Sequence, residues 1–474
     1  MTSVIWFRQD LRLADNPALV HAAARGPILG LYVLDETSAP NGRPIGGASR
    51  WWLHKSLEAL SKAFGGLVLL RGNPRELVPA FAEAAKATGV YWNRCYEPYS
   101  VARDTAVKAA LKAMDVDASS FNGSLLFEPW DIKTLDGAPY KVYSPFWRAC
   151  QKSTVAVPQA VSNFEAASRR PMGDRLTDWR LLPSKPNWAR EFETTWTPGE
   201  AGALVRFNAF LNHNLRGYAE LRDRPGKPNV SRLSPHLHFG EISPRQVWAT
   251  AKMHAEIQPA SRADCDKFLA ELGWREFSHH LLYHFPQLPV LNWKPEFDAY
   301  PWSDNAAYLA SWQKGMTGYP IVDAGMRELW KTGSMHNRVR MIAASFLIKH
   351  LRIDWRQGEA WFWDTLVDAD LANNTASWQW VAGCGADAAP YFRIFNPIAQ
   401  GRKFDPDGTY VRRWCPELAK LPNDLIHAPF EGTISQLEAA GVRLGTTYPK
   451  PLVDHASARD AALAGYARIK SANV

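Results

Sequence analysis

Hydrophobic residues in the first part of the chain fall into short runs, separated by longer stretches in which apolar positions recur with a helical period. The runs are SVIWF at 3–7, PILGLYVL at 27–34, LVLLR at 67–71 and GVYW at 89–92. Apolar residues recur every three or four positions across 50–64 and 74–88, and Asn16 followed by Pro17 is typical of a helix start. Strands alternating with helices predict an α/β fold, a doubly wound parallel sheet, over residues 1–128.

The pattern changes after residue 128. Prolines and tryptophans collect over 129–195 while the hydrophobic periodicity weakens, which predicts a long connector with a few short helices. From 196 to 474 the spacing of apolar residues by three and four predicts an all-α domain. Its expected helices span 201–214, 243–256, 262–284, 305–315, 324–332, 337–350 and 358–368.

Length and composition are those of an ordinary folded protein. A chain of 474 residues with 46% hydrophobic content is long enough for two or three domains with full cores. The five cysteines are odd in number and form no C-x-x-C pair, which argues against a disulfide framework. The N-terminus MTSVIWFRQDLR lacks the pattern of a signal peptide, and no run approaches the roughly 18 apolar residues of a membrane span. We therefore expect a cytoplasmic protein without a membrane partner.

The charge balance favours a polyanionic partner. The formal net charge of +8 fits binding to nucleic acid, although a surplus of this size also serves solubility alone. The 21 tryptophans strengthen the nucleic-acid interpretation, because flat aromatic side chains on a basic surface stack on exposed bases. For most of these tryptophans we nevertheless expect a place in the core.

The stretch Leu366–Pro397 concentrates polar groups among aromatic and small residues. It holds Asp368, Asp370, Asn373, Asn374, Trp378, Trp380, Gly383 and Gly385. Buried carboxylates and amides need hydrogen-bond partners, and a flat ligand with polar edges, held against tryptophan, supplies them. We interpret WQWV as strand-like and the G-x-G-x-x-A that follows as a bend. A dinucleotide fingerprint is disfavoured because Pro390 interrupts the helix that should follow.

The expected helix at 262–284 carries a second candidate site. Glu271, Trp274, Arg275 and Ser278 share one of its faces. A glutamate and an arginine four residues apart typically form a solvated surface pair. The tryptophan between them and the apolar surroundings favour instead a polar face that lines a cavity.

Three histidines at the end of this helix invite a metal interpretation. His280 and His284 share a helical face, and His279 lies next to them. They are accompanied by no H-E-x-x-H pattern, no third ligand at a usual spacing and no cysteine cluster. We therefore predict no metal site.

Two polar segments are suited to phosphate. The run SRLSPHLHFGEISPRQV from Ser231 offers hydroxyls, an arginine and a capped helix start at Ser243, although an ordinary capped loop fits it equally well. In MHNRVRM at 335–341, Arg338 can meet a phosphate, and Arg340 can neutralise a carboxylate of the 366–397 stretch.

Taken together, these segments resemble the photolyase/cryptochrome family of flavoproteins. The motifs that carry the resemblance, in family order, are WFRQDLRLADNPAL, SRLSPHL, WREF, GYPIVDAGMREL, MHNRVRM, DADLANN, WQWVAG, YFRIFNP and KFDPDGTYVRRW. They run from Ser3 to about Pro451. The resemblance implies an N-terminal α/β antenna domain at 1–128, a connector at 129–195 and a helical domain at 196–474 that holds FAD.

The resemblance also assigns cofactor contacts by position. The residues that match FAD contacts of the family are Tyr218, Ser231, Arg232, Leu233, Ser234, Arg275, Arg340, Asp368, Asp370 and Asn374. Asn374 matches the residue that faces flavin N5, which is asparagine in photolyases and aspartate in plant-type cryptochromes. Val230 departs from the threonine that commonly precedes the S-R-L-S run.

The substrate implied by the resemblance is a cyclobutane pyrimidine dimer in UV-damaged DNA. Enzymes that repair (6-4) photoproducts have catalytic histidines where this chain has Asn337 and Met341. The residues expected at the dimer or at its flanking phosphates are Arg222, Glu271, Trp274, Asn337, Arg338, Met341, Trp380 and Arg393. Blue light is expected to drive an electron from fully reduced FAD to the flipped-out dimer. Glu271, helped by Asn337, is expected to stabilise the dimer radical anion by hydrogen bonds.

Three tryptophans match the family's electron-hopping chain, which reduces oxidised FAD in light: Trp378, Trp355 and Trp302. A second, antenna chromophore is expected in the first domain, with Glu97 as a weak candidate contact. Methenyltetrahydrofolate is the first choice, and a deazaflavin, a lumazine or a flavin stays open.

Two rival functions stay open at this point. The first is a cryptochrome-type blue-light receptor without repair activity, against which Asn374 argues, as does a chain that ends at Val474 without a long tail. The second is a DNA-binding flavoprotein that does not repair. We expect a monomer that is cytoplasmic and associates with the nucleoid when bound to DNA.

Overall fold

The computed structural model of the chain describes residues 2–36, 44–160, 163–388 and 392–471. The chain divides into two compact units, each built from several stretches. Unit 1 comprises Met1–Arg216, Ser231–Pro286 and Val367–Ala372, and unit 2 comprises Gly217–Val230, Gln287–Leu366 and Asn373–Val474. The predicted domain limits at 128 and 195 stay a prediction.

Unit 1 contains a parallel sheet of five strands in the order β3-β2-β1-β4-β5. The strands are β1 Thr2–Phe7, β2 Ile28–Leu34, β3 Leu67–Arg71, β4 Ala87–Asn93 and β5 Asp117–Phe121. The central strand β1 pairs on both sides, with Val4 opposite Leu29 of β2 and Val90 of β4. This topology confirms the predicted doubly wound α/β fold.

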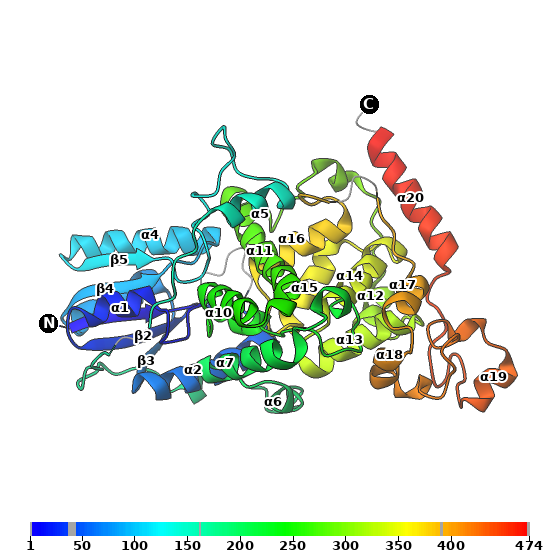
Figure 1. Ribbon diagram of the computed structural model, residues 1–474, viewed down its shortest axis with the longest axis horizontal. Helices are drawn as coiled ribbons and strands as arrows, with labels where there is room; N and C mark the ends of the chain where they lie inside the picture. Colours follow the sequence, from blue (N-terminus) through cyan, green and yellow to red (C-terminus); the bar gives the residue numbers. More distant parts are fainter. Residues whose placement is uncertain (1, 37–43, 161–162, 389–391, 472–474) are drawn as a thin grey trace. The chain divides into compact units, whose positions relative to one another are not determined.

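Alternate residues of β1 enter two different cores, as the period of two along a strand requires. Ile5 and Phe7 join a cluster that includes buried residues of α1 (Pro17–Ala23) and α2 (Gly47–Phe64). Val4 and Trp6 join a cluster with residues of α3 (Pro74–Ala84) and α4 (Pro98–Ala113). Figure 1 shows α1, α2 and α4 beside the sheet, in blue and cyan. Asn16 caps α1, where its side chain accepts the N–H of Leu19 at 3.1 Å, as predicted.

Apart from isolated β-bridges, the remaining regular secondary structure of the described residues is helical, which confirms the prediction for the C-terminal part. The helices of unit 1 are α1 Pro17–Ala23, α2 Gly47–Phe64, α3 Pro74–Ala84, α4 Pro98–Ala113, α5 Tyr143–Lys152, α6 Phe192–Thr195, α7 Glu200–Ala209, α9 Ser234–His238, α10 Pro244–Ile257 and α11 Arg262–His284. Those of unit 2 are α8 Tyr218–Leu221, α12 Ala306–Gln313, α13 Pro320–Thr332, α14 Asn337–Ser345, α15 Trp355–Thr365, α17 Pro397–Phe404, α18 Thr409–Trp414, α19 Ile434–Ala439 and α20 His455–Ser471.

One further helix, α16 Leu371–Ala382, corrects the prediction that WQWV is strand-like. The tryptophans and valine continue a helix that begins among leucine, alanine and asparagine, so the hydrogen bonding already established overrides the β propensity of four residues. The predicted bend is confirmed at Gly383, which ends the helix with a φ of +95°. Pro390, the residue that disfavours a dinucleotide fingerprint here, lies outside the described residues.

Two predicted helices end differently from the expectation. The helices expected at 201–214 and 337–350 both finish in a π-helical turn, η3 Phe210–Asn214 and η6 Phe346–His350. Among the described residues, no helix is both long and apolar enough to cross a membrane.

Candidate functional site

In unit 1 the S-R-L-S run meets one of the two predicted carboxylates. Asp368 accepts a hydrogen bond of 2.5 Å from the Ser234 hydroxyl, and only 8% of Asp368 is exposed. The chain before Ser234 turns sharply, because Arg232 adopts a left-handed φ of +52°. Two residues that the family resemblance predicts as FAD contacts are thus joined by a direct hydrogen bond.

The second carboxylate, Asp370, belongs to a buried polar cluster. It lies 3.5 Å from Nε2 of His279 and 3.6 Å from Nδ1 of His238. Burial opposes its ionisation, but the two imidazoles outweigh burial and hold the pKa of Asp370 well below its usual range. Burial and the charge of Asp370 raise the pKa of Glu97, the candidate antenna contact. In the described parts of the chain, no group of three or more His, Cys, Asp and Glu is arranged to hold a metal ion.

Helix α11 presents Glu271, Trp274 and Arg275 as predicted, but each already has a protein neighbour. The rings of Trp274 and Tyr143 are stacked at 3.7 Å with 10° between their planes, which leaves only the opposite face or the edge of Trp274 for a base. Glu271 lies 4.0 Å from Lys267 Nζ. Arg275 donates to the carbonyl of Ser124 at 2.9 Å.

Sequence reasoning missed Glu276, the next residue on α11. It is 3% exposed, and its carboxylate accepts the backbone N–H groups of Leu126 and Phe127 at 2.9 and 3.4 Å. Burial raises the pKa of Glu276 to about 7, despite the neighbouring Arg275. The local sequence gives no signal for Glu276, because a glutamate inside W-R-E-F looks like any surface residue of a helix.

The histidines of α11 bind the backbone of the segment after β5. His280 Nε2 accepts the N–H of Tyr140 at 3.0 Å, and His284 Nε2 lies 2.9 Å from the carbonyl of Pro129. Burial lowers the pKa of His280 to about 4, so its ring is neutral and suited to accept at Nε2.

In unit 2, Asn374 is held by an acid that the sequence did not single out. Its amide donates to Glu359 Oε1 at 2.8 Å and to the Glu359 carbonyl at 3.1 Å. Asn374 is 8% exposed and Glu359 2%, and Glu359 belongs to α15. Two acceptors on one amide group fix its orientation, so Asn374 Oδ1 has a defined direction too.

Trp378 and Trp380 face in different directions on α16. Residues two positions apart in an α-helix, such as Trp378 and Trp380, are separated by about 200° around the helix axis. Trp378 is 2% exposed and packs on Phe362 at 5.0 Å, whereas Trp380 is half-buried and donates from Nε1 to the carbonyl of Asp387 at 3.1 Å. The two tryptophans are therefore not one aromatic pair.

The packing of Trp378 depends on Gly358 of α15. A Cβ atom at residue 358 would lie 2.2 Å from the ring of Trp378, far inside contact distance. Trp355 is fully buried and donates from Nε1 to Asn292 Oδ1 at 2.9 Å, and Trp302 lies 4.5 Å from the ring of Tyr300. An electron path through Trp378, Trp355 and Trp302 stays a prediction.

Two of the three predicted phosphate contacts, Arg338 at the start of α14 and Arg222 at the end of α8, share one acidic neighbour. Asn337 is exposed at the first position of the helix, and Arg338 forms an ion pair of 2.8 Å with Asp223. Arg222 lies 3.9 Å from the same Asp223, a residue that the sequence analysis missed.

Further contacts within unit 2 involve two other predicted residues, Arg340 and Tyr218. Arg340 donates from Nε to the carbonyl of Met335 at 2.7 Å. The guanidinium of Arg222 lies 5.5 Å from the ring centroid of Tyr218, and Met341 is half-buried on α14.

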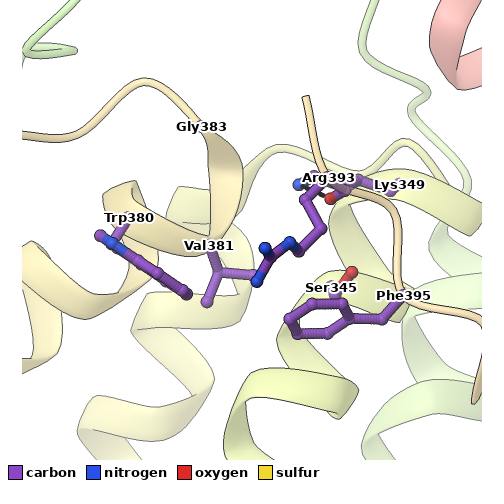
Figure 2. Close-up of a pocket in the computed structure, with 7 residues that line it drawn as sticks. All are labelled: Ser345, Lys349, Trp380, Val381, Gly383, Arg393 and Phe395. Carbon is purple, nitrogen blue, oxygen red and sulfur yellow. Dashed lines mark hydrogen bonds between the residues drawn. The ribbon is translucent and has the colours of Figure 1, made fainter. Parts of the chain in front are cut away.

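A pocket in unit 2 joins two of the predicted DNA contacts (Figure 2). It is lined by Ser345, Lys349, Trp380, Val381, Gly383, Arg393 and Phe395. Figure 2 shows the side chain of Arg393 reaching from its coil toward Val381, with Trp380 beyond Val381. Lys349 and Ser345 were not singled out from the sequence.

Comparison with known proteins agrees with this combination of an α/β unit and buried polar groups on helices. Residues 3–163 match the family model described as DNA photolyase, and residues 268–468 match the FAD binding domain of DNA photolyase. The fold and these matches define a flavoprotein class, and the chain belongs to the photolyase/cryptochrome family.

Particular relatives cover the chain almost from end to end. It is 52% identical to a deoxyribodipyrimidine photo-lyase of Agrobacterium fabrum, over 98% of either chain. A crystal structure of a bacterial class III photolyase from Agrobacterium tumefaciens is 50% identical, covers 99% of this chain and 98% of its own, and has a TM-score of 0.96. Cryptochrome-1 of Arabidopsis thaliana is 37% identical over 96% of this chain and 69% of its own length.

Proposed function

We propose that this protein is a light-dependent DNA repair enzyme, a deoxyribodipyrimidine photo-lyase, that splits cyclobutane pyrimidine dimers in UV-damaged DNA. The observation that carries the proposal is the 52% identity to a photolyase over 98% of the chain. The basic net charge of +8 supports a polyanionic partner.

The buried polar groups fit FAD. A flavin ring presents an N–H donor between two carbonyl acceptors, so its edge needs both acceptors and donors from the protein. Asp368 and Asp370 supply carboxylates, and the fixed amide of Asn374 supplies a further polar group. The phosphates of FAD would be bound by Tyr218, Ser231, Arg232, Leu233 and Ser234. The remaining polar edges of FAD would be bound by Arg275 and Arg340. Bound FAD, in its reduced form, supplies the electron that light makes available for splitting the dimer.

The dimer is received by aromatic and polar side chains. Stacking of a base on Trp274 or Trp380 contributes about 1–3 kcal/mol each, comparable with the few kcal/mol that flipping the dimer out of the duplex costs. Arg222, Arg338 and Arg393 contact the flanking phosphates, while Asn337 and Met341 line the dimer. These arginines belong to unit 2.

Glu271 and Asn337 act on the dimer itself. One electron added to the dimer places negative charge on a base carbonyl, and a hydrogen bond from an O–H or N–H donor stabilises that charge. Two carbon–carbon bonds of the cyclobutane ring then break, and the same electron returns, so no net oxidation occurs. Trp378, Trp355 and Trp302 serve a separate step, the light-driven reduction of oxidised FAD.

Three further properties belong to the proposal. A second, antenna chromophore binds in the α/β domain near Glu97, with methenyltetrahydrofolate as the first choice. The coupling of the Glu97 and Asp370 ionisations supports a position of Glu97 close to the FAD-binding residues. The enzyme acts as a monomer in the cytoplasm and associates with the nucleoid through DNA.

A cryptochrome-type receptor is the second candidate, favoured by the 37% identity to Cryptochrome-1 of Arabidopsis thaliana. The two functions differ at Asn374, where plant-type cryptochromes have aspartate. The Asn374 amide donates to the acid Glu359 at 2.8 Å, a hydrogen bond that an ionised aspartate could not donate.

One assay separates these functions. An oligonucleotide with a single thymine dimer is mixed anaerobically with the reduced holoenzyme and exposed to blue light. We expect absorbance at the base band to recover, with no recovery in the dark or with oxidised enzyme. Binding of the oligonucleotide without recovery in light would reject repair and favour a receptor or a DNA-binding flavoprotein.

A further inference from the structure

Lys349 is a buried cation for which the proposed chemistry has no use. It is 3% exposed and lies in the π-helical turn η6 that follows α14. A buried ammonium is costly unless its N–H groups are bonded. In the described part of the chain Lys349 forms no ion pair, and its Nζ donates instead to the backbone carbonyl of Arg393.

The segment that receives this bond has no regular structure of its own. Residues 392–396 belong to neither a helix nor a strand, and Arg393 is exposed. The Lys349 ammonium also lies 4.5 Å from the ring centroid of Phe392, which stacks on Tyr466 at 4.7 Å with 10° between the planes. One lysine thus anchors two successive residues of the coil, the first through its ring and the second through its backbone.

The same lysine connects three elements with proposed DNA contacts. It lies beyond the C-terminus of α14, whose first residues include Asn337 and Arg338. It bonds to the coil that carries Arg393, and with Arg393 it lines the pocket that includes Trp380 of α16 (Figure 2).

We propose that Lys349 is a positioning residue for damaged DNA, which holds Arg393 at the rim of the pocket beside Trp380. The inference rests on the proposed phosphate contact of Arg393. Its effect runs through hydrogen bonding rather than through attraction of DNA. Burial lowers the pKa of Lys349 to about 7, against the influence of Cys384, so its charge is partly lost at neutral pH.

A double-mutant cycle tests this inference. Dissociation constants for a dimer-containing oligonucleotide are measured in the dark with FAD-loaded Lys349→Met, Arg393→Ala and the double variant. We expect each single variant to bind about threefold to tenfold more weakly, and the double variant to bind no more weakly than Arg393→Ala, because both changes remove one contact. The slope of binding against salt should fall by about one in the double variant, where two independent phosphate contacts would lower it by about two.

A rate measurement and a matched control complete the test. The repair rate at saturating DNA should not change in Lys349→Met, because a positioning residue for binding leaves the bound complex competent. Lys470→Met removes a lysine 4.9 Å from the ring of Tyr466, in the same aromatic stack, and should leave binding unchanged. FAD content and melting temperature confirm folding, and Lys349→Gln replaces the methionine variant in the cycle where that variant loses FAD.

Three outcomes would overturn the inference. Additive losses would mean that Lys349 does not act through Arg393, and unchanged binding of the Lys349 variant would mean that it positions nothing. Unchanged binding of Arg393→Ala would remove the contact on which the inference depends. Light-driven repair by the wild-type enzyme is measured separately, so any of these results can be told apart from failure of the proposed function.

Discussion

Glu271 is the single residue on which the proposed repair chemistry depends most. Its carboxylate is partly exposed on α11 and lies 4.0 Å from Lys267, a distance at which a surface ion pair contributes little to stability. A bound base therefore competes with only a weak ion pair for the Glu271 carboxyl group.

Replacing Glu271 by glutamine tests this role. We expect Glu271→Gln to lower the repair yield about threefold or more, because a charge-assisted hydrogen bond to the reduced dimer is weakened. FAD content should not change. Lys267→Gln, which removes only the surface pair, serves as the control, and an unchanged yield in Glu271→Gln would exclude the role.

Trp378 gives a second prediction at this scale. Trp378→Phe should slow photoreduction of the oxidised enzyme while sparing repair by enzyme that was reduced beforehand. The measurement is flavin absorbance under blue light, with and without chemical reduction. A loss of repair by the pre-reduced variant would contradict the assignment of Trp378 to the hopping chain.

The close packing of Gly358 against Trp378 allows the same electron path to be tested without changing the tryptophan. Gly358→Ala places a methyl group where only 2.2 Å separates it from the ring, so the indole must shift. Overpacking of this kind costs about 1–3 kcal/mol. We expect a lower melting temperature and slower photoreduction together, and a normal photoreduction rate would mean that the path does not use this ring position.

At the scale of elements, periodicity predicted most helices and four strands of the sheet. The helix at 262–284 was predicted with its observed bounds, because apolar residues recur at three- and four-residue spacing along its whole length. Strand β5 was missed, since DASSF has only one large apolar residue and is paired on one side alone. WQWV was wrongly predicted as strand-like, because these four residues alone do not show that they continue a helix that begins at Leu371.

The residues of the candidate site likewise fall into those that local sequence reveals and those that only the fold reveals. Asp368, Asn374 and Trp380 could be found because they stand in motifs of local sequence. Glu276, Glu359 and Lys349 could not, because each acts on a partner 15 to 150 residues away in the chain, a contact that only the fold creates.

The joint between α11 and the segment after β5 predicts a pH dependence. The pKa of Glu276 is raised to about 7 in the folded chain, above its ordinary value of 4.5. Between these values the unfolded chain loses a proton that the folded chain keeps, so stability falls as pH rises through this window, by about 3 kcal/mol in total. Glu276→Gln should remove that decline. Urea midpoints at pH 5 and pH 8 measure it, and parallel curves for the two proteins would contradict the assignment.

Helix α14 and the segment before Ser231 predict a change in DNA affinity. Asp223 lies 2.8 Å from Arg338 and 3.9 Å from Arg222, so it competes with phosphate for both cations. We expect Asp223→Asn to tighten binding of damaged and undamaged DNA about threefold to tenfold at low salt. Asp407→Asn, which removes a carboxylate 3.9 Å from Lys227, controls for net charge. Equal effects of the two variants would attribute the gain to charge alone.

At the scale of the whole molecule, the net charge of +8 and the three proposed arginines set how binding responds to salt. Each phosphate contact that is lost lowers the slope of log affinity against log salt by about one. Undamaged DNA should show a similar slope of log affinity against log salt but a lower affinity, since stacking on tryptophan requires a flipped dimer.

Unit 1 is built from three separate stretches of the chain, which limits how the protein can be divided into stable fragments. Phe239 and Val367 belong to the same hydrophobic core as β1 and α2, although they come from the second and third stretches. Glu241 accepts from the indole of Trp52 at 3.0 Å, and Arg245 pairs with Asp15 at 3.0 Å. A fragment that stops at Arg216 would retain every strand yet expose this core and leave a buried aspartate without its arginine. The sheet of unit 1 should therefore not fold stably as a separate N-terminal fragment.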